Sequence, residues 1–291
     1  MNSGIKKTTF GDYVIITLMV LLILVCILPV MNVISIALSD AGAIMRREVA
    51  FLPVGFNIDT FTTVLGDARF MRSLTWTAVL TAIVVVVNLT MTILCAYPLT
   101  FMSLKGRKII SFLIIFTMLF GAGLIPTFVL LRDLNLLNNP LVLILPGMIS
   151  VFNMIIMRNF FLGIPDSLKE SAEIDGAGPI IILIKIYLPL SVPVLATIGL
   201  FYAVGRWNGF QDALFFMQGA SEWHPIQMLL FNIIENNTAF DVADPGATSP
   251  PGWGEAIQAA AIVIAMVPIL CVYPFIQKYF VQGATLGAVK G

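Results

Sequence analysis

Charge is what this sequence lacks most. Only 11% of its 291 residues are charged, with 16 positive and 16 negative side chains, whereas an ordinary soluble domain carries about 25%. This scarcity excludes an intrinsically disordered chain, which would be polar and highly charged. A formal net charge of zero also excludes a nucleic-acid-binding protein that works through a basic surface. A soluble globular domain is disfavoured too, because so few charges could not cover its surface.

Cysteine and histidine are also scarce. Each of the three cysteines, Cys26, Cys95 and Cys271, lies inside a long apolar run. This setting favours small buried hydrophobic side chains over a disulfide framework or a redox pair. The single histidine, His224, has no companions that could complete a metal site. We therefore expect no bound metal.

Long apolar segments dominate what is present, with 59% hydrophobic residues overall. A helix needs about 20 mostly apolar residues to cross a membrane, and only helices or closed barrels can do so without open backbone groups. The sequence therefore predicts an all-α, polytopic membrane protein with one transmembrane domain over residues 1–291. The expected spans are approximately residues 13–39, 73–101, 109–131, 138–157, 186–205 and 256–278.

An even number of spans places both termini on one side of the cell membrane. With both termini cytoplasmic, the inner segments hold ten of the 16 Lys and Arg residues, and the turn Lys105-Gly106-Arg107-Lys108 is the best single indicator. The extracytoplasmic loops are then residues 40–72 and 206–255. The second, rich in proline and glycine, is expected to be ordered but irregular. Its tryptophans indicate either anchoring at the interface or a surface that docks a partner.

One interior segment differs from the rest of the chain. Residues 158–185 hold seven charges in 28 positions. Within them, Pro165-Asp166-Ser167 predicts a helix start with Ser or Asp as N-cap, and Gly176-Ala177-Gly178-Pro179 predicts its end. We expect a short helix along the cytoplasmic surface with small residues exposed at Ser171, Ala172 and Ala177.

This segment resembles a known motif. Glu170-Ser171-Ala172, then Gly176 after three residues, then Ile186-Tyr187-Leu188-Pro189 after nine more, is similar to the EAA loop of permease subunits from binding-protein-dependent ABC importers. The one departure is Ser171, where the family more often has alanine. The end of the chain, from Tyr273-Pro274 to Gly291, resembles the carbohydrate branch, in particular MalG-like subunits of the LplC/YtcP type.

The resemblance implies the fold of a type I, MetI-like importer permease and several partners. These are a homologous second permease in a heterodimer, a dimer of ATPase subunits, an extracytoplasmic solute-binding protein and the lipid bilayer. The expected cargo is an oligosaccharide, such as a product of polysaccharide breakdown. This sequence contains no G-x-x-x-x-G-K-[ST] loop, so the chain is expected to be no enzyme, with no cofactor of its own. ATP and Mg would bind the partner ATPase.

The resemblance also implies site residues. The cytoplasmic coupling loop, 158–187, would dock on the ATPase and drive alternating access. The glycine-rich tail would contact the ATPases too, and one tip of the loop 206–255 would dock the binding protein. The coupling residues would be Glu170, Ser171, Ala172, Glu173, Asp175, Gly176 and Ala177; the tail Gly287, Ala288, Val289, Lys290 and Gly291; the docking tips Gly219, Ala220 and Ser221 or Asn236 and Asn237.

Polar residues within the spans leave two interpretations open. Asn32, Asn88 and Asn153 are candidates for lining the pathway, or they bond neighbouring helices. The predicted spans contain no central ionisable residue, which weighs against a proton-coupled carrier. A stand-alone six-span carrier or channel remains the alternative to an importer subunit, and an ABC importer for an amino acid or peptide is a third possibility.

Overall fold

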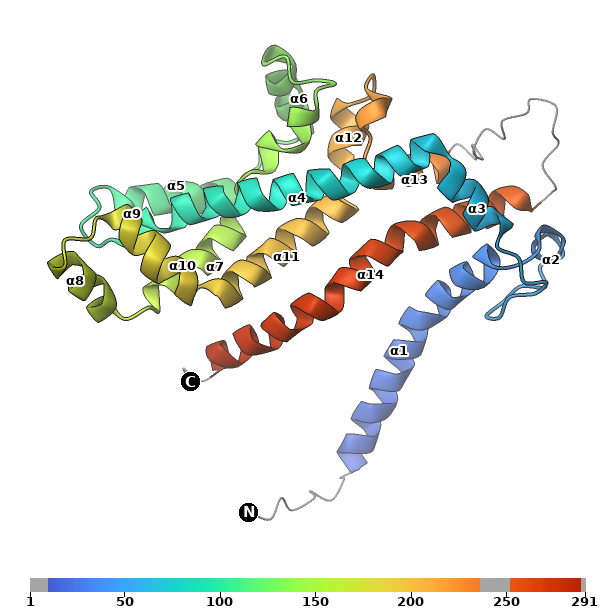
Figure 1. Ribbon diagram of the computed structural model, residues 1–291, viewed down its shortest axis with the longest axis horizontal. Coiled ribbons are helices and arrows are strands. Elements are labelled where there is room, and N and C mark those ends of the chain that lie inside the picture. The colour runs from blue at the N-terminus through green and yellow to red at the C-terminus, as the bar shows by residue number, and fades with distance from the viewer. Residues whose placement is uncertain (1–9, 236–251, 289–291) are drawn as a thin grey trace. The chain divides into compact units, whose positions relative to one another are not determined.

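The computed structural model describes residues 10–235 and 252–288, with side chains for those up to residue 272 and for Pro274. Every regular element in this part of the chain is a helix (Figure 1), which confirms the all-α prediction. The chain divides into two compact units: unit 1 is Met1–Ala68 with Leu230–Met266, and unit 2 is Arg69–Leu229 with Val267–Gly291. We describe each unit by itself, and the single domain over residues 1–291 stays a prediction.

Unit 1 contains the first predicted span. Helix α1 covers Phe10–Ala37, with Pro29 inside it, and most of its side chains from Phe10 to Met31 are exposed in this chain. Two short helices follow, α2 at Ala41–Met45 and α3 at Asp59–Gly66. The backbone N–H of Asp59 donates to the Asn57 Oδ1 over 2.6 Å, which stabilises the start of α3.

Unit 2 is organised around α4, Ala68–Ala96. One face of this helix is buried at intervals of three or four residues, which is the period of an amphipathic helix. In Figure 1 α4 runs alongside α7 (Val151–Leu162) and α11 (Val192–Asn208). A buried hydrogen bond of 2.7 Å between the Thr92 and Tyr202 hydroxyls joins α4 to α11. The buried face of α4 consists of Phe70, Ser73, Thr77, Leu80, Val84, Asn88, Thr92 and Ala96.

Three helices of the described chain are long and apolar enough to cross a membrane by themselves. Three bent helix pairs raise the number to six if each pair forms one span. The unbroken helices are Phe10–Ala37, Ala68–Thr100 (α4 with the 3-10 turn η1, Pro98–Thr100) and Trp253–Val272, the described apolar part of α14, Trp253–Ala288.

The third predicted span, 109–131, is not one straight helix. It forms α5 (Arg107–Leu119) and α6 (Leu124–Asp133), bent by 112°. Gly123 separates them at a φ of 87° and a ψ of 172°, a conformation that residues with a Cβ rarely adopt. The apolar run predicted the length of this span. The turn within it depends on the backbone conformation of Gly123.

The fourth and fifth predicted spans are broken as well. Residues 138–157 include the 3-10 turns η2 (Pro140–Leu143) and η3 (Leu145–Gly147) before α7 begins, with a bend of 47°. The predicted span 186–205 begins inside a helical run from Pro179 to Leu190, and this run meets α11 at an angle of 83°. That run comprises α9 (Pro179–Ile182), the π-helical segment η4 (Leu183–Tyr187) and α10 (Leu188–Leu190). Prolines interrupt both spans, because proline has no N–H to continue the helix.

The described part of the loop 206–255 is less irregular than predicted. It contains α12 (Gln211–Phe216), the 3-10 turn η5 (Ser221–Trp223) and α13 (Ile226–Glu235). Burial explains the last of these helices, since Ile226, Met228 and Leu230 lie in the interior. A stretch too short to span a membrane can still form a helix when one of its faces is packed.

Candidate functional site

The motif-bearing helix, α8, begins with proline at its N-cap. It covers Asp166–Ile174, and Pro165 precedes it without a side-chain cap hydrogen bond. The expectation of Ser or Asp as N-cap is therefore wrong, because Asp166 and Ser167 are already helical. The Asp166 carboxylate still favours the helix, since a negative charge in the first turn complements the helix dipole. Figure 1 shows α8 at one end of unit 2, near α9.

The helix ends in a Schellman motif. The backbone N–H of Ala177 donates to the Ala172 carbonyl over 2.9 Å, and that of Gly176 donates to the Glu173 carbonyl over 3.0 Å. Gly176 has a φ of 80° and open space around its Cα. Glycine is therefore needed at this position for its backbone conformation and not for lack of space, because the residue after the C-cap of a Schellman motif is left-handed. This explains why the motif needs glycine four residues after its alanine.

Two of the small motif residues face inward. Ala172 and Ala177 are half-buried and pack against a core cluster that includes Tyr97, Phe161 and Tyr187. The expectation that both would be exposed with Ser171 is wrong. The Schellman bond brings these residues together, and their small side chains allow α8 to approach the core of its own chain.

Lys169 also joins the side of α8 that faces the core cluster to the Phe101 ring. Its Nζ lies 4.5 Å from the centroid of the Phe101 ring and 3.8 Å from the Glu173 carboxylate one helical turn later. A cation over an aromatic face is attracted by the ring quadrupole, and an i,i+4 ion pair supports the helix. The lysine side chain is only 25% exposed, so this charge faces the core surface rather than solvent.

Tyr97, just after α4, connects several parts of this region. Its hydroxyl donates to the Pro179 carbonyl over 3.0 Å, and its ring meets the Tyr187 ring edge-on at 5.1 Å between centroids. Phe161 packs edge-on against both rings, at 6.2 Å from Tyr97 and 5.4 Å from Tyr187. Edge-to-face contacts at these distances are favourable. The end of α4 is thereby joined to α7 and to the π-helical segment that follows the motif.

The outer face of α8 is defined as Glu170, Ser171, Glu173, Ile174 and Asp175. All five residues are exposed, and the Ile174 side chain is 87% exposed. This face therefore combines carboxylates and a hydroxyl with one apolar side chain. Sequence reasoning listed the polar members but missed Ile174, although its place on an otherwise polar helix was a usable signal.

The three asparagines proposed for the pathway have different surroundings. Asn88 is buried, and its Nδ2 donates to the Gly147 carbonyl over 2.9 Å, while its Oδ1 has no partner among the described residues. This bond joins α4 to η3 and supports the helix-bonding role. Asn153 is buried in α7. In unit 1 the Nδ2 of Asn32 donates to the Ala50 carbonyl over 2.6 Å.

The proposed docking tips are also placed in part. At Gly219-Ala220-Ser221, the Gly219 N–H donates to Asn138 Oδ1 over 2.7 Å, and Ala220 is buried. Of these three residues, only Gly219 and Ser221 are exposed and could contact a binding protein. Asn236 and Asn237 lie outside the described residues.

The tail residues divide at the end of the last helix. Gly287 and Ala288 are helical, because α14 continues to Ala288. Val289, Lys290 and Gly291 lie outside the described residues.

The segment around η5 is anchored on α4. The Trp76 Nε1–H donates to the Trp223 carbonyl over 2.8 Å, and the two indole rings lie edge-on with centroids 4.8 Å apart. The Thr77 hydroxyl accepts the Ile226 N–H over 2.7 Å. His224 is buried, with its Nε2 2.8 Å from the Met217 carbonyl. Trp223 thus contacts α4 while its side chain stays 39% exposed.

A buried arginine orders the beginning of this segment. The Arg206 side chain is 6% exposed and lies 3.1 Å from an Asp212 carboxylate oxygen. Its guanidinium also donates to the carbonyls of Leu143 and Gly209. A buried charge requires such partners, so Arg206 holds η2 and α12 at the end of α11.

Comparison with known proteins identifies the family. Residues 88–285 match the family described as "Binding-protein-dependent transport system inner membrane component". The chain belongs to this family. The matched region of this permease includes residues 158–187, which carry the EAA-like motif, and this agrees with the resemblance found there.

Two curated relatives from Bacillus subtilis (strain 168) are similar over nearly their whole length. One, the "Polygalacturonan/rhamnogalacturonan transport system permease protein YtcP", is 40% identical over 98% of this chain and 100% of its own. The other, "Protein LplC", is 40% identical over 92% of this chain and 90% of its own. These relatives confirm the predicted branch of the family.

Solved structures agree with the fold. A chain of a bacterial ABC transporter involved in import of the acidic polysaccharide alginate superposes with a TM-score of 0.86 at 33% identity, over 94% of this permease and 99% of that chain. A second chain, from an alginate ABC transporter in complex with an alginate pentasaccharide-bound periplasmic protein, has a TM-score of 0.59 at 18% identity, over 91% of this chain and 93% of its own, and supports the fold alone.

Proposed function

We propose that this permease carries oligosaccharides released from polysaccharides across the cytoplasmic membrane. The relative with full-length coverage is named for polygalacturonan and rhamnogalacturonan transport. The similar solved structure comes from an importer of alginate. Both substrates are acidic polysaccharides, so uronic acid oligomers are the favoured cargo. Membership in a binding-protein-dependent family favours an importer subunit over a stand-alone carrier or channel.

The arrangement of α8 is the observation that supports coupling to ATP. The helix is held on its inner side by Ala172, Ala177 and Lys169. It presents the outer face of α8 to its surroundings. A partner that grips this face can transmit a rigid-body motion, because the inner side is packed against the core near the start of α9. Movement of α8 would then tilt the bent helices that follow it and alternate the access of the pathway.

Several partners follow from this role. A pair of ATPase subunits would bind α8 on the cytoplasmic side and hold the ATP and Mg. A homologous second permease would complete the pathway, and a solute-binding protein would deliver the sugar from outside. The family description supports the last partner. The chain itself would perform no chemistry, and both its termini would be cytoplasmic.

The end of the chain offers a second contact with the ATPases. Helix α14 continues to Ala288, so it carries Gly287 and Ala288 of the predicted tail. Deletion of residues 283–291 should reduce ATPase activity stimulated by the binding protein while leaving the basal rate of the ATPases unchanged. Full retention of stimulation would exclude a coupling role for the tail.

The decisive experiment is reconstitution. The permease, its homologous partner and the ATPases should take up trigalacturonate into liposomes only when ATP and the binding protein are both supplied. A variant of the outer face, Ile174→Asp, should abolish ATP-driven uptake without lowering thermal stability, because Ile174 is exposed. Uptake by this permease alone, without ATP, would instead support the stand-alone carrier.

A further inference from the structure

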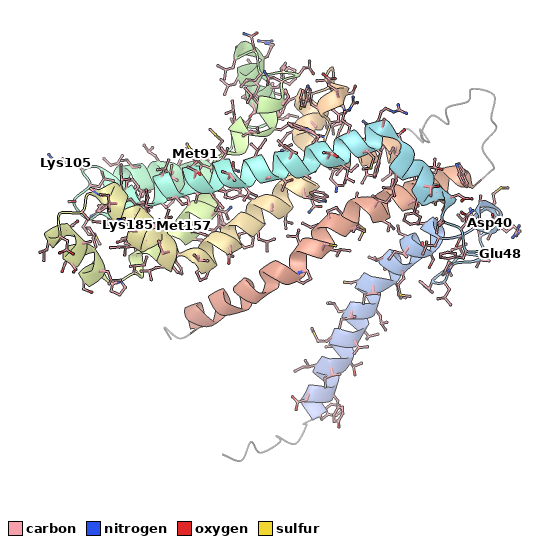
Figure 2. The ribbon with its side chains drawn as sticks, viewed as in Figure 1. Asp40, Glu48, Met91, Lys105, Met157 and Lys185 are labelled. Carbon is pink, nitrogen blue, oxygen red and sulfur yellow. The ribbon has the colours of Figure 1, made fainter. Side chains whose placement is uncertain are left out.

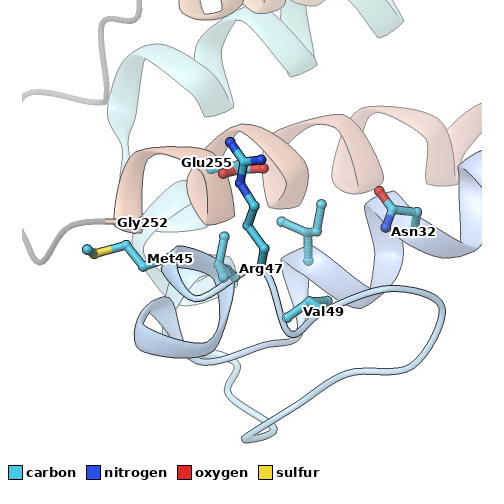
Figure 3. Close-up of a pocket in the computed structure, with 8 residues that line it drawn as sticks. Asn32, Met45, Arg47, Val49, Gly252 and Glu255 are labelled. Atoms are coloured by element: carbon cyan, nitrogen blue, oxygen red, sulfur yellow. The ribbon is translucent and has the colours of Figure 1, made fainter.

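Unit 1 contains a cavity that the coupling mechanism does not use. Its volume is about 580 Å³, within the range of about 300–1,000 Å³ typical of small-molecule sites. It lies where the two predicted extracytoplasmic loops meet, beside the end of α1 and the start of α14 (Figure 3). Its walls combine polar and apolar residues, including Asn32, Arg47 and Glu255 with Ile36, Ile44 and Val49.

Arg47 provides the positive charge of this cavity. Its neighbour Arg46 is engaged with Glu48, with Nε and Oε1 2.8 Å apart. Arg47 forms no ion pair with any residue that the structure describes. Its backbone has a φ of 55°, a left-handed conformation that is unfavourable for residues with a Cβ. Figure 3 shows the Arg47 side chain extending toward α14, the helix that carries Glu255.

Asn32 and Glu255 provide hydrogen-bond acceptors. The Asn32 Nδ2 donates to the Ala50 carbonyl, which orients the amide, and its Oδ1 accepts no hydrogen bond from the described part of the chain. Glu255 is an exposed acid in the first turn of α14. The cavity therefore offers a guanidinium donor together with carboxylate and carboxamide acceptors.

The walls of the cavity are held in place before any ligand binds. Gly252 lies so close to α2 that a Cβ there would be 2.5 Å from the Ala41 carbonyl oxygen. The Asp40 carboxylate accepts the Gly42 N–H over 3.0 Å, and the Ser39 hydroxyl accepts the Val54 N–H over 3.0 Å. Preorganised walls reduce the entropy that is lost on binding.

We infer that this cavity binds one saccharide unit of the cargo, with a preference for a uronate. The Arg47 guanidinium can hold the sugar carboxylate in a bidentate pair. Glu255 and the Asn32 Oδ1 can accept hydrogen bonds from sugar hydroxyls, and Ile36, Ile44 and Val49 can contact a sugar face. A lipid phosphate diester fits less well, because the phosphate brings acceptors alone. This inference deepens the proposed function and rests on it for the identity of the cargo.

Equilibrium binding to the full chain in lipid nanodiscs tests the site. Titration calorimetry with trigalacturonate should show binding that Arg47→Gln weakens at least about tenfold, as expected for loss of a hydrogen bond to a charged group. Arg46→Gln is the matched control, because it removes the same charge at the neighbouring position outside the cavity, and it should change the affinity less than twofold. The neutral trisaccharide galactotriose should bind more weakly, with little response to Arg47→Gln.

Three outcomes would overturn the inference. They are no detectable binding of trigalacturonate by the wild-type chain, equal losses in the two arginine variants, and a loss of co-purified phospholipid in Arg47→Gln without any change in sugar binding. Thermal unfolding in detergent confirms that each variant is folded, and Glu255→Gln gives a second variant of the same cavity. ATP-driven uptake by the complete importer separates the two proposals, because uptake that is insensitive to Arg47→Gln would reject this subsite and leave the proposed function intact.

Discussion

The Ala177 N–H and the Ala172 carbonyl are joined by a hydrogen bond of 2.9 Å, and both side chains pack on the same core cluster. The small residues of the motif therefore act within the permease as well as at its surface. They close the end of α8 and seat the helix on its own chain. The acidic residues, Ser171 and Ile174 are exposed and remain for the proposed ATPase partner.

Gly176→Ala should weaken the C-terminal cap of α8. The left-handed φ of 80° is costly for alanine, so the change should destabilise the region by about 1 kcal/mol and reduce ATP-driven uptake. Gly178→Ala is the matched control, because Gly178 has an ordinary φ of −72° and open space around it. Hydrogen exchange of the α8 amides and uptake should both change for Gly176 and not for Gly178. Equal exchange in the two variants would argue against the cap.

Aspartate substitutions should separate the two faces of α8. Ala172→Asp places a carboxylate against the core cluster, and an unsatisfied buried polar group costs roughly 1–3 kcal/mol, so thermal stability should fall. Ser171→Asp lies on the exposed face and should leave stability unchanged while lowering ATPase stimulation. Unfolding monitored by circular dichroism in detergent measures the first effect. A stable Ala172→Asp variant would contradict the inward placement.

The contact between Lys169 and Phe101 should be measurable in a double-mutant cycle. Lys169→Met and Phe101→Leu remove the cation and the ring in turn, and the pair distance is 4.5 Å. We expect a coupling energy of roughly 0.5–1 kcal/mol, because the site is only partly desolvated. A second cycle with Lys185→Met and Phe101→Leu serves as the control, because Lys185 lies at the same end of unit 2 (Figure 2) but is not the lysine placed over the Phe101 ring. A coupling energy near zero for Lys169 would exclude a stabilising contact.

Trp76→Phe should loosen the segment around η5. The change keeps an aromatic ring but removes the donor of the 2.8 Å bond to the Trp223 carbonyl, at a cost of about 1 kcal/mol. Amide exchange should quicken in residues 220–226, with no change in α8. Trp253→Phe tests an indole that makes no such bond to Trp223. Unchanged exchange in Trp76→Phe would show that ring packing and the Thr77 hydrogen bond anchor the segment without the indole donor.

The ion pair next to the unit 1 cavity should be visible in a titration. Hydrogen bonds from Arg46 hold the pKa of Glu48 below its ordinary value. The stabilisation by this exposed pair is therefore present above the ordinary pKa of Glu48 and is lost as the pH falls through the lowered value. Arg46→Gln should raise the pKa of Glu48 toward the ordinary value, measured by carboxyl-carbon NMR. An unchanged pKa would show that another group stabilises the carboxylate.

The sequence alone could establish the class of protein and the place of its motif. Charge scarcity and apolar length indicate membrane helices because hydrocarbon tolerates neither charges nor open backbone groups. The end of α8 was also readable, since Gly176 supplies a left-handed residue that the local chain requires. These features depend on local chemistry and on composition, which a linear sequence displays directly.

Tertiary structure decided which faces and which distant residues meet. The inward placement of Ala172 and the position of Lys169 over the Phe101 ring depend on contacts between segments that are far apart in the chain. Likewise, the sequence placed Asn32 in a span and Arg47 and Glu255 in different loops, and only the fold of unit 1 brings them to one cavity. A periodic pattern shows that a helix has a buried side. Which residues cover that side depends on contacts between segments that are distant in the sequence.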